Sequence, residues 1–153
     1  MNRQRNEERS HDIVLWGATG FTGSLVAEYL VNNASAEDMK LALGGRSRTK
    51  LEALRQRLAD IDAGAARLPL VVADSHDRAS LDAMVRDARV VCTTVGPYAI
   101  YGSTLVGACV EAGTDYCDLA GETQWIRKMI DTYHERACDS GARIVHCCGF
   151  DSV

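Results

Sequence analysis

The segment Asp12–Gly23 constrains the fold of this chain more than any other. It reads DIVLWGATGFTG, a short apolar run that breaks into glycines at Gly17, Gly20 and Gly23. Glycines are needed where a chain turns tightly, brings bare backbone close to a phosphate and packs a helix closely on a strand. A helix that begins near Phe21 would point its unpaired N–H groups at such an anion. The segment therefore predicts a dinucleotide site.

The glycine spacing is G-x-x-G-x-x-G, whereas the more familiar dinucleotide fingerprint has one residue between its first two glycines. The alternative is an ordinary glycine-rich turn between a strand and a helix. The flanking residues favour the nucleotide turn, because Ile13–Trp16 has the character of a buried strand and an apolar helix face follows at Leu25, Val26, Tyr29 and Leu30.

The rest of the chain alternates between strand and helix patterns. Further strands are expected at 40–43, 68–73, 89–95, 115–119 and 143–148, and further helices at 50–58, 79–87, 104–112 and 123–140. Short loops between alternating elements predict a doubly wound parallel α/β sheet of the Rossmann type, with right-handed crossovers and helices on both faces. The expected strand order is 3-2-1-4-5-6, with ligands at the carboxyl ends of the strands.

Length and charge limit the class of protein further. The chain has 153 residues and a net charge of −4, which fits one domain and gives no support to a nucleic-acid partner. Residues 1–11 are expected to form a flexible polar tail and residues 12–153 the domain. The tail cannot serve as a secretory signal and no apolar run approaches a membrane span, so a cytoplasmic location is expected. The alternative is peripheral membrane association through a further region.

Six cysteines occur without a C-x-x-C motif and without zinc spacing. They are Cys92, Cys109, Cys117, Cys138, Cys147 and Cys148. We expect reduced, packed thiols and no metal site, and we favour packing over chemistry for the last two, although they lie near the expected ligand edge.

The residues after the second strand indicate which cofactor binds. NAD-binding domains usually carry a carboxylate there, whereas this chain has Arg46, Ser47 and Arg48, with Lys50 close behind. Arg46 can stack on adenine or bind phosphate, Ser47 can donate its hydroxyl, and the other cations add charge. NADP is therefore expected; the alternative is a solvated basic loop.

Two further loops are expected at the same edge of the sheet. Asp74 and Ser75 follow the third strand, where they either line the adenine pocket or simply end the strand. Gly96 and Pro97 follow the fourth strand and should meet the nicotinamide end of the cofactor, while Tyr98 either reaches a substrate or lies on the rim.

Polar residues near the fifth and sixth strands have two readings each. Asp118, Gly121 and Glu122 end the fifth strand, where a carboxylate could act as an acid or base or anchor a loop; anchoring is favoured. His146 is expected inside the sixth strand as a packed residue rather than a catalyst.

The segments GATGFTG, GGRS, VGPYAIYG, YCDLAGE and CGFDSV together resemble the saccharopine dehydrogenase-like oxidoreductases, including the trans-acting enoyl reductases of bacterial lipid synthesis. The resemblance implies an amino-terminal Rossmann domain that holds NADP. It also implies a second domain, expected after residue 153, that binds substrate and forms a homodimer. Trp16 departs from the small or branched residue usual at its position.

The resemblance implies roles for named residues but no catalytic acid or base. It places Gly17, Thr19, Gly20, Phe21, Thr22 and Gly23 around the pyrophosphate, Arg46 and Ser47 at the 2′-phosphate, Gly96, Pro97 and Tyr98 near the nicotinamide ribose, and Phe150, Asp151 and Ser152 close to the same site.

The function expected from these features is hydride transfer to an enoyl thioester or a related lipid- or amino-acid-derived intermediate. One alternative is an extended short-chain dehydrogenase or epimerase, but none of the five tyrosines is followed by the lysine of the Tyr-x-x-x-Lys motif. Another is a regulator that senses NADP without turnover.

Overall fold

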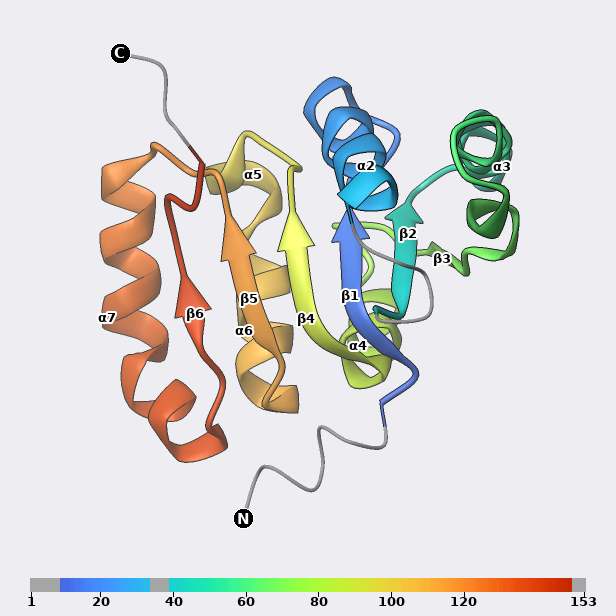
Figure 1. Cartoon of the computed structure of the whole chain (residues 1–153). Coiled ribbons are helices and arrows are strands. Elements are labelled where there is room, and N and C mark those ends of the chain that lie inside the picture. Colours follow the sequence, from blue (N-terminus) through green and yellow to red (C-terminus); the bar gives the residue numbers. More distant parts are fainter. Residues whose placement is uncertain (1–8, 34–38, 150–153) are drawn as a thin grey trace.

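The computed structural model describes residues 9–33 and 39–149 (Figure 1). The strands are β1 (His11–Trp16), β2 (Leu41–Gly45), β3 (Leu70–Val72), β4 (Ala88–Thr93), β5 (Asp115–Asp118) and β6 (Ile144–Val145). The helices are α2 (Phe21–Asn33), α3 (Arg48–Ala59), the 3-10 helix η1 (Ala63–Arg67), α4 (Arg78–Asp87), α5 (Tyr98–Tyr101), α6 (Ser103–Ala112) and α7 (Thr123–Ser140).

The six strands form one parallel sheet in the order β3-β2-β1-β4-β5-β6, as predicted. The order reverses between β1 and β4, so the carboxyl ends of these neighbouring strands leave a crevice for a ligand. Glycines end two of the helices as expected, because Gly113 and Gly141 adopt left-handed backbone with φ of 64° and 77°.

The helices lie in two layers, and the direction of the chain along the sheet decides which layer each joins. Helices α2 and α3 connect β1 to β2 and β2 to β3, and they share an apolar cluster with Leu15 and Leu43 on one face. After β3 the strand order runs the other way, so right-handed crossovers place α4, α6 and α7 on the opposite face, around Val91 and Tyr116. Figure 1 shows both layers.

Strand β2 is longer than predicted, because Gly44 and Gly45 continue it instead of forming a loop. Gly44 lies opposite Trp16 in the register of β1 and β2. A Cβ on Gly44 would lie 3.1 Å from the indole ring of Trp16. The large side chain at position 16 is therefore accommodated by a missing side chain on the neighbouring strand, and Trp16 is 2% exposed.

Strands β3 and β6 are shorter than predicted, because both lie at edges of the sheet and pair on one side only. Val72 at the end of β3 is 47% exposed, so β3 is not covered on both faces at this end, although apolar residues fill the predicted range 68–73. His146 follows β6 instead of lying within it. Helices α5 and η1 were not predicted.

The buried face of α2 agrees with the predicted one only in part, because Val26 and Leu30 pack against the apolar cluster as expected. Leu25 and Tyr29 are exposed, whereas Gly23 and Ala27 are buried against the sheet. Small residues allow the helix axis to approach the strands closely, so the sheet-facing side of this helix is narrow and carries little apolar bulk. The prediction followed side-chain size and missed this close approach.

Ordered structure begins before the predicted boundary at Asp12. The Arg9 guanidinium donates hydrogen bonds to the Ala88 and Ala112 carbonyl oxygens and to the Thr114 hydroxyl, which ties the start of the domain to the sheet and to α6. Phe150, Asp151 and Ser152 lie outside the described residues, so their expected approach to the site remains a prediction.

The complementarity of Trp16 and Gly44 can be tested by a double-mutant cycle. Gly44→Ala should lower the free energy of unfolding by about 1–3 kcal/mol, because the added methyl group overpacks against the indole. In a Trp16→Leu background the same change should cost at least about 1 kcal/mol less, since the two sites are in contact. Urea denaturation of the four proteins measures this coupling; additive effects would contradict it.

Candidate functional site

A cleft of about 400 Å³ lies at the carboxyl ends of the central strands. The turn after β1, the end of β2 and the loops after β3 and β4 all contribute to it. Its lining consists of Trp16, Gly17, Thr19, Gly20, Gly45, Arg46, Ser47, Lys50, Asp74, Ser75, His76, Thr94, Val95, Gly96 and Tyr101. The cleft therefore occupies the position where ligands bind in open α/β sheets.

The glycine turn forms one wall of this cleft. Gly17 has a φ of 87°, a conformation that favours glycine, and a Cβ there would lie 2.6 Å from the Val95 side chain. A Cβ on Gly23 would lie 2.0 Å from the Gly17 carbonyl oxygen, so α2 packs directly on the turn. The first intrahelical bond runs from the Ser24 N–H to the Gly20 carbonyl oxygen, which leaves the preceding N–H groups available to an anion.

Cationic residues after β2 line the same cleft. Arg46 and Lys50 line it with Ser47, whose hydroxyl accepts a hydrogen bond from the Lys50 N–H as the N-cap of α3. The hydroxyl hydrogen of Ser47 is thereby left to donate. Arg48, in contrast, pairs with Glu52 on the helix surface and does not line the cleft. Two of the three predicted cations thus reach the site.

The loop after β3 closes the far side of the cleft. The Asp74 carboxylate accepts a hydrogen bond from the His76 N–H at 2.8 Å, which holds the turn, and Ser75 is buried in the lining. The His76 ring meets Tyr101 edge to face at 5.5 Å. Sequence reasoning missed both of these aromatic residues; the end of the unpredicted helix α5 brings Tyr101 there.

Tyr98 lies in the core instead of reaching the cleft, so neither predicted position for it is found. Its hydroxyl donates to the Thr93 carbonyl oxygen and accepts from the Leu119 N–H, both at 3.2 Å, and its ring stacks on Trp125. Burial raises the pKa of this phenol to about 12. Tyr98 therefore ties the ends of β4 and β5 together.

Four other predicted residues are not part of the cleft lining: Phe21, Thr22, Gly23 and Pro97. Phe21 is 84% exposed at the start of α2. The side chains of Phe21 and Thr22 are solvent-exposed because the turn presents backbone, and not side chains, to the cleft.

Glu122 anchors a loop, as favoured from the sequence. Its two carboxylate oxygens accept hydrogen bonds from the Tyr98 and Ala99 N–H groups, at 2.6 and 2.8 Å. These N–H groups begin helix α5, where a carboxylate compensates for the missing intrahelical partners. Glu122 thereby positions the helix that carries Tyr101 into the cleft.

Asp118 anchors a second loop. One carboxylate oxygen accepts from the Tyr116 hydroxyl at 2.8 Å and lies 2.6 Å from Nδ1 of His146, and the other accepts from the Ala120 and Cys147 N–H groups. Burial opposes ionisation of Asp118, but these hydrogen bonds outweigh it and hold its pKa below the ordinary value.

The His146 side chain is packed, as expected, with 8% of it exposed. It lies edge to face against Trp125 and Tyr116. Cys147 beside it has a φ of 59°, which is unusual for a residue with a side chain, and its N–H bond to Asp118 holds it there.

The six cysteines are free thiols, and no cluster able to hold a metal ion occurs in residues 9–33 and 39–149. Within these ranges no helix is long and apolar enough to cross a membrane.

The cleft fits a phosphorylated dinucleotide. Its lining combines a glycine turn whose missing side chains leave backbone exposed with two cations and a capping hydroxyl. The saccharopine dehydrogenase NADP binding domain matches residues 13–145. The chain belongs to this family, and NADP is the cofactor of the domain.

The curated relatives are much longer than this chain. A putative trans-acting enoyl reductase of Mycobacterium tuberculosis is 52% identical over 145 residues, which are 95% of this chain and 33% of the relative. A trans-acting enoyl reductase of Mycobacterium bovis is 51% identical over 146 residues, 34% of its length. The chain thus spans about a third of these proteins.

Solved structures show the same fold at low sequence identity. The apo saccharopine dehydrogenase (L-Glu forming) of Saccharomyces cerevisiae superposes with a TM-score of 0.71 and 19% identity, over 91% of this chain and 27% of that one. An NADPH-dependent quinone oxidoreductase of Escherichia coli, complexed with NADPH, superposes with a TM-score of 0.58 and 20% identity, over 88% of this chain and 47% of that one.

The role of Asp118 predicts a pH-dependent stability difference. Asp118→Asn should lower the free energy of unfolding at pH 7 by about 1–3 kcal/mol, because an amide NH₂ would face bound donors. Because folding lowers the pKa of Asp118, its contribution is complete above the ordinary value near 3.8 and is lost as the pH falls through the folded value. The difference between the two proteins should therefore shrink below about pH 4.

Urea denaturation between pH 3 and pH 7 measures this difference. Asp131→Asn is the matched control, because Asp131 pairs with Arg127 on the exposed surface of α7 and should matter by less than about 0.5 kcal/mol. A constant difference across this range would contradict an anchoring carboxylate.

Proposed function

We propose that this domain binds NADPH in a reductase that transfers hydride to an enoyl substrate, and that Arg46, Ser47 and Lys50 select the 2′-phosphate. The observation that carries the proposal is that these residues line the same cleft as the glycine turn. The glycine turn lies between β1 and α2, and the cationic residues lie between β2 and α3. Since β1 and β2 are paired in the sheet, the fold sets the distance between the two phosphate subsites.

The chain contributes position and charge, while the chemistry belongs to the cofactor. When bound, NADPH supplies the hydride. The N–H groups of Phe21, Thr22 and Gly23 at the start of α2 would hold the pyrophosphate, since those of Gly17 and Gly20 already bond to the Gly44 and Gly17 carbonyl oxygens. Gly96 would let the nicotinamide ribose approach the backbone after β4. Pro97 would restrict the conformation of that loop, and the buried Tyr98 would support it from outside the cleft.

Each group at the cationic end has a distinct task. Arg46 is exposed and has no ion-pair partner among the described residues, so its guanidinium is free to bind phosphate in a bidentate manner. Lys50 adds a point charge, and the Ser47 hydroxyl adds one donor. Asp74, held by the turn to His76, would border the adenosine.

The substrate class is inferred from the relatives. Proteins about 50% identical to this chain carry the name enoyl reductase, and an enoyl thioester is an electrophile that accepts hydride. The substrate-binding region would lie in a second domain after residue 153, which would also form the homodimer. No residue that lines the cleft is assigned as a catalytic acid or base.

Replacement of Arg46 should remove most of the preference for NADPH. Arg46→Ala should raise the Kd for NADPH about 10- to 100-fold, the loss expected for a charge-assisted hydrogen-bonded pair, and leave the Kd for NADH within about twofold. Isothermal titration of this chain with both cofactors measures the two constants.

Arg48→Ala is the matched control. It removes the same charge two positions along the chain, but the Arg48 side chain pairs with Glu52 and does not line the cleft. Equal losses for both cofactors, or equal effects of the two substitutions, would contradict a 2′-phosphate site at Arg46.

Turnover distinguishes a reductase from a sensor of NADP. The full-length protein mixed with NADPH and an enoyl thioester should show loss of the 340 nm absorbance of NADPH in stopped flow, with one saturated thioester formed per NADPH oxidised. Saturable binding of NADPH with no oxidation across a panel of enoyl thioesters would favour the regulatory alternative.

A further inference from the structure

One half of the sheet lacks a covering layer on one face. On the face of α2 and α3, the row across the strands reads Leu15, Cys92, Cys117 and Val145 in register. Leu15 is fully buried beneath α2 and α3, Cys92 and Cys117 are half-buried, and Val145 is 51% exposed. The exposed fraction of the side chains thus rises from β1 to β6, with distance from α2 and α3.

The topology explains why no crossover within the domain can cover this half. The connections that flank β4, β5 and β6 are α4, α6 and α7, and right-handed crossovers place all three on the opposite face. Figure 1 shows β4, β5 and β6 with no described helix in front of them. Extending the same sheet beyond β6 would again add a helix to the opposite face.

The uncovered surface is apolar, although solvent would favour polar residues there. We call it the β4–β6 face and define it by Val90, Cys92, Cys117 and Val145. Parallel sheets occur almost only with both faces covered, and their strands are then apolar on both sides. The residues of this face follow that rule, so the strands have the composition of a buried sheet with one layer missing.

A hollow lined by both apolar and charged residues lies at the amino-terminal end of these strands. It measures about 280 Å³ and its floor includes Ile13, Met39 and Val90. Ion pairs flank it, with the Arg89 guanidinium 2.8 Å from Asp12 and the Arg143 guanidinium against Asp115. An occupant with apolar residues inward and polar residues at its ends would satisfy both the floor and the rim.

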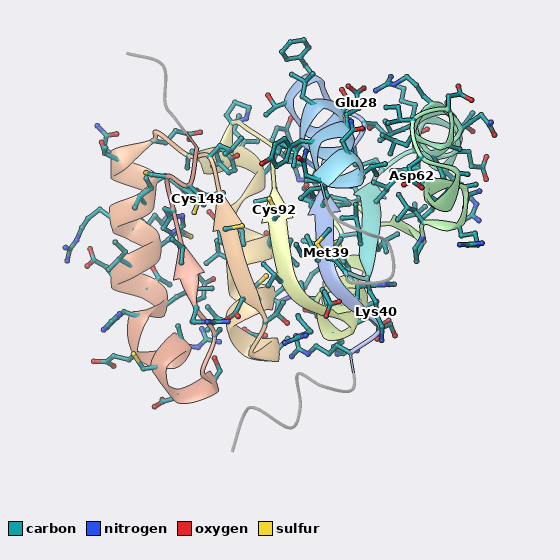
Figure 2. All side chains as sticks on the ribbon, viewed as in Figure 1. Glu28, Met39, Lys40, Asp62, Cys92 and Cys148 are labelled. Atoms are coloured by element: carbon teal, nitrogen blue, oxygen red, sulfur yellow. The ribbon has the colours of Figure 1, made fainter. Side chains whose placement is uncertain are left out.

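Cysteine side chains lie at the carboxyl-terminal end of the face, and their reactivity can show whether the face is covered. Figure 2 shows Cys92 and Cys148 on this half of the sheet. The Cys148 N–H donates to the Asp118 carbonyl oxygen at the end of β5, and the Cys148 thiol lies 3.5 Å from the Val145 carbonyl oxygen, so Cys148 lies beside the face. Cys148 is exposed, and so is Cys138 on α7.

We propose that the β4–β6 face is the docking surface for a segment of the full-length protein that follows residue 153 and returns to this domain. The curated relatives support an occupant from the same polypeptide, because about two thirds of their length lies outside the matched region. A tethered segment also binds at a high effective concentration. The proposal rests on the domain organisation proposed above and not on the enoyl substrate.

Thiol labelling tests the proposal without any substitution. This chain and the full-length protein are treated with iodoacetamide under native conditions, and labelling is followed by mass spectrometry of peptides. In this chain Cys148 and Cys138 should both react. In the full-length protein the labelling rate of Cys148 relative to Cys138 should fall about tenfold or more, because buried thiols are inert.

A pair of matched substitutions adds an independent measurement. Val145→Glu lies on the face, and Ile130→Glu replaces a residue of similar exposure, 44%, on α7. In this chain the two changes should have similar, small effects on Tm. In the full-length protein Val145→Glu should lower Tm by about 5 °C more than Ile130→Glu does, because it places a charge in an interface.

The two experiments distinguish a docked segment of the full-length protein from a second copy of this chain. Unchanged reactivity of Cys148 in the full-length protein, or equal Tm shifts for the two variants there, would overturn the proposal. Protection of Cys148 in this chain alone, rising with its concentration together with dimer formation in sedimentation, would overturn it in favour of a second copy. Loss of turnover with protection intact would contradict the proposed reductase function and leave the docking surface standing.

Discussion

The contact between helix α2 and the turn after β1 is the constraint on which the site depends. A Cβ at position 23 would overlap the Gly17 carbonyl oxygen at 2.0 Å, so the helix can approach this turn only if residue 23 has no side chain. The same close approach explains why the small residue Ala27 is buried against the sheet, while Leu25 and Tyr29 are exposed. It also brings the helix N-terminus against the crevice between β1 and β4, where an anion gains most from unpaired N–H groups. Helix packing and phosphate binding thus depend on the same glycines.

The reversal of strand order produces both the cleft and the uncovered half of the sheet. Because the chain runs outward from β1 first to β3 and then, after α4, to β6, neighbouring loops diverge at β1 and β4 and leave space for a ligand. The same reversal moves α4, α6 and α7 to the opposite face. A sheet of this topology therefore has its binding site and an uncovered apolar face side by side, and a segment docked on that face would lie near the loops that end β4 and β5.

The sequence predicted those features that depend on local pattern. The glycine turn, the strand order and the basic residues after β2 follow from spacing and residue type, and Leu81, Met84 and Val85 face the core as their periodicity indicates. The features it missed depend on contacts between distant residues. Tyr98 follows a glycine and a proline at the ligand edge, as a site residue would. Its hydroxyl, however, hydrogen-bonds at the ends of β4 and β5 and its ring stacks on Trp125, so the side chain is buried. Tyr101 reaches the cleft because Glu122, more than twenty positions away, caps a four-residue helix that has no periodic signal of its own.

The two loop anchors show how a rigid edge is built beside a ligand site. Asp118 is the last residue of β5 and Glu122 follows the strand, and each carboxylate accepts hydrogen bonds from backbone N–H groups beyond the ends of the strands. A buried carboxylate is costly unless several donors meet it, and Asp118 has four. Neither carboxylate lines the cleft, and the contacts of both carboxylates position loops. In a domain whose task is to hold a cofactor in place, such residues contribute to binding by keeping the loops of β4 and β6 in the conformation that the cofactor meets, which lowers the ordering cost of association.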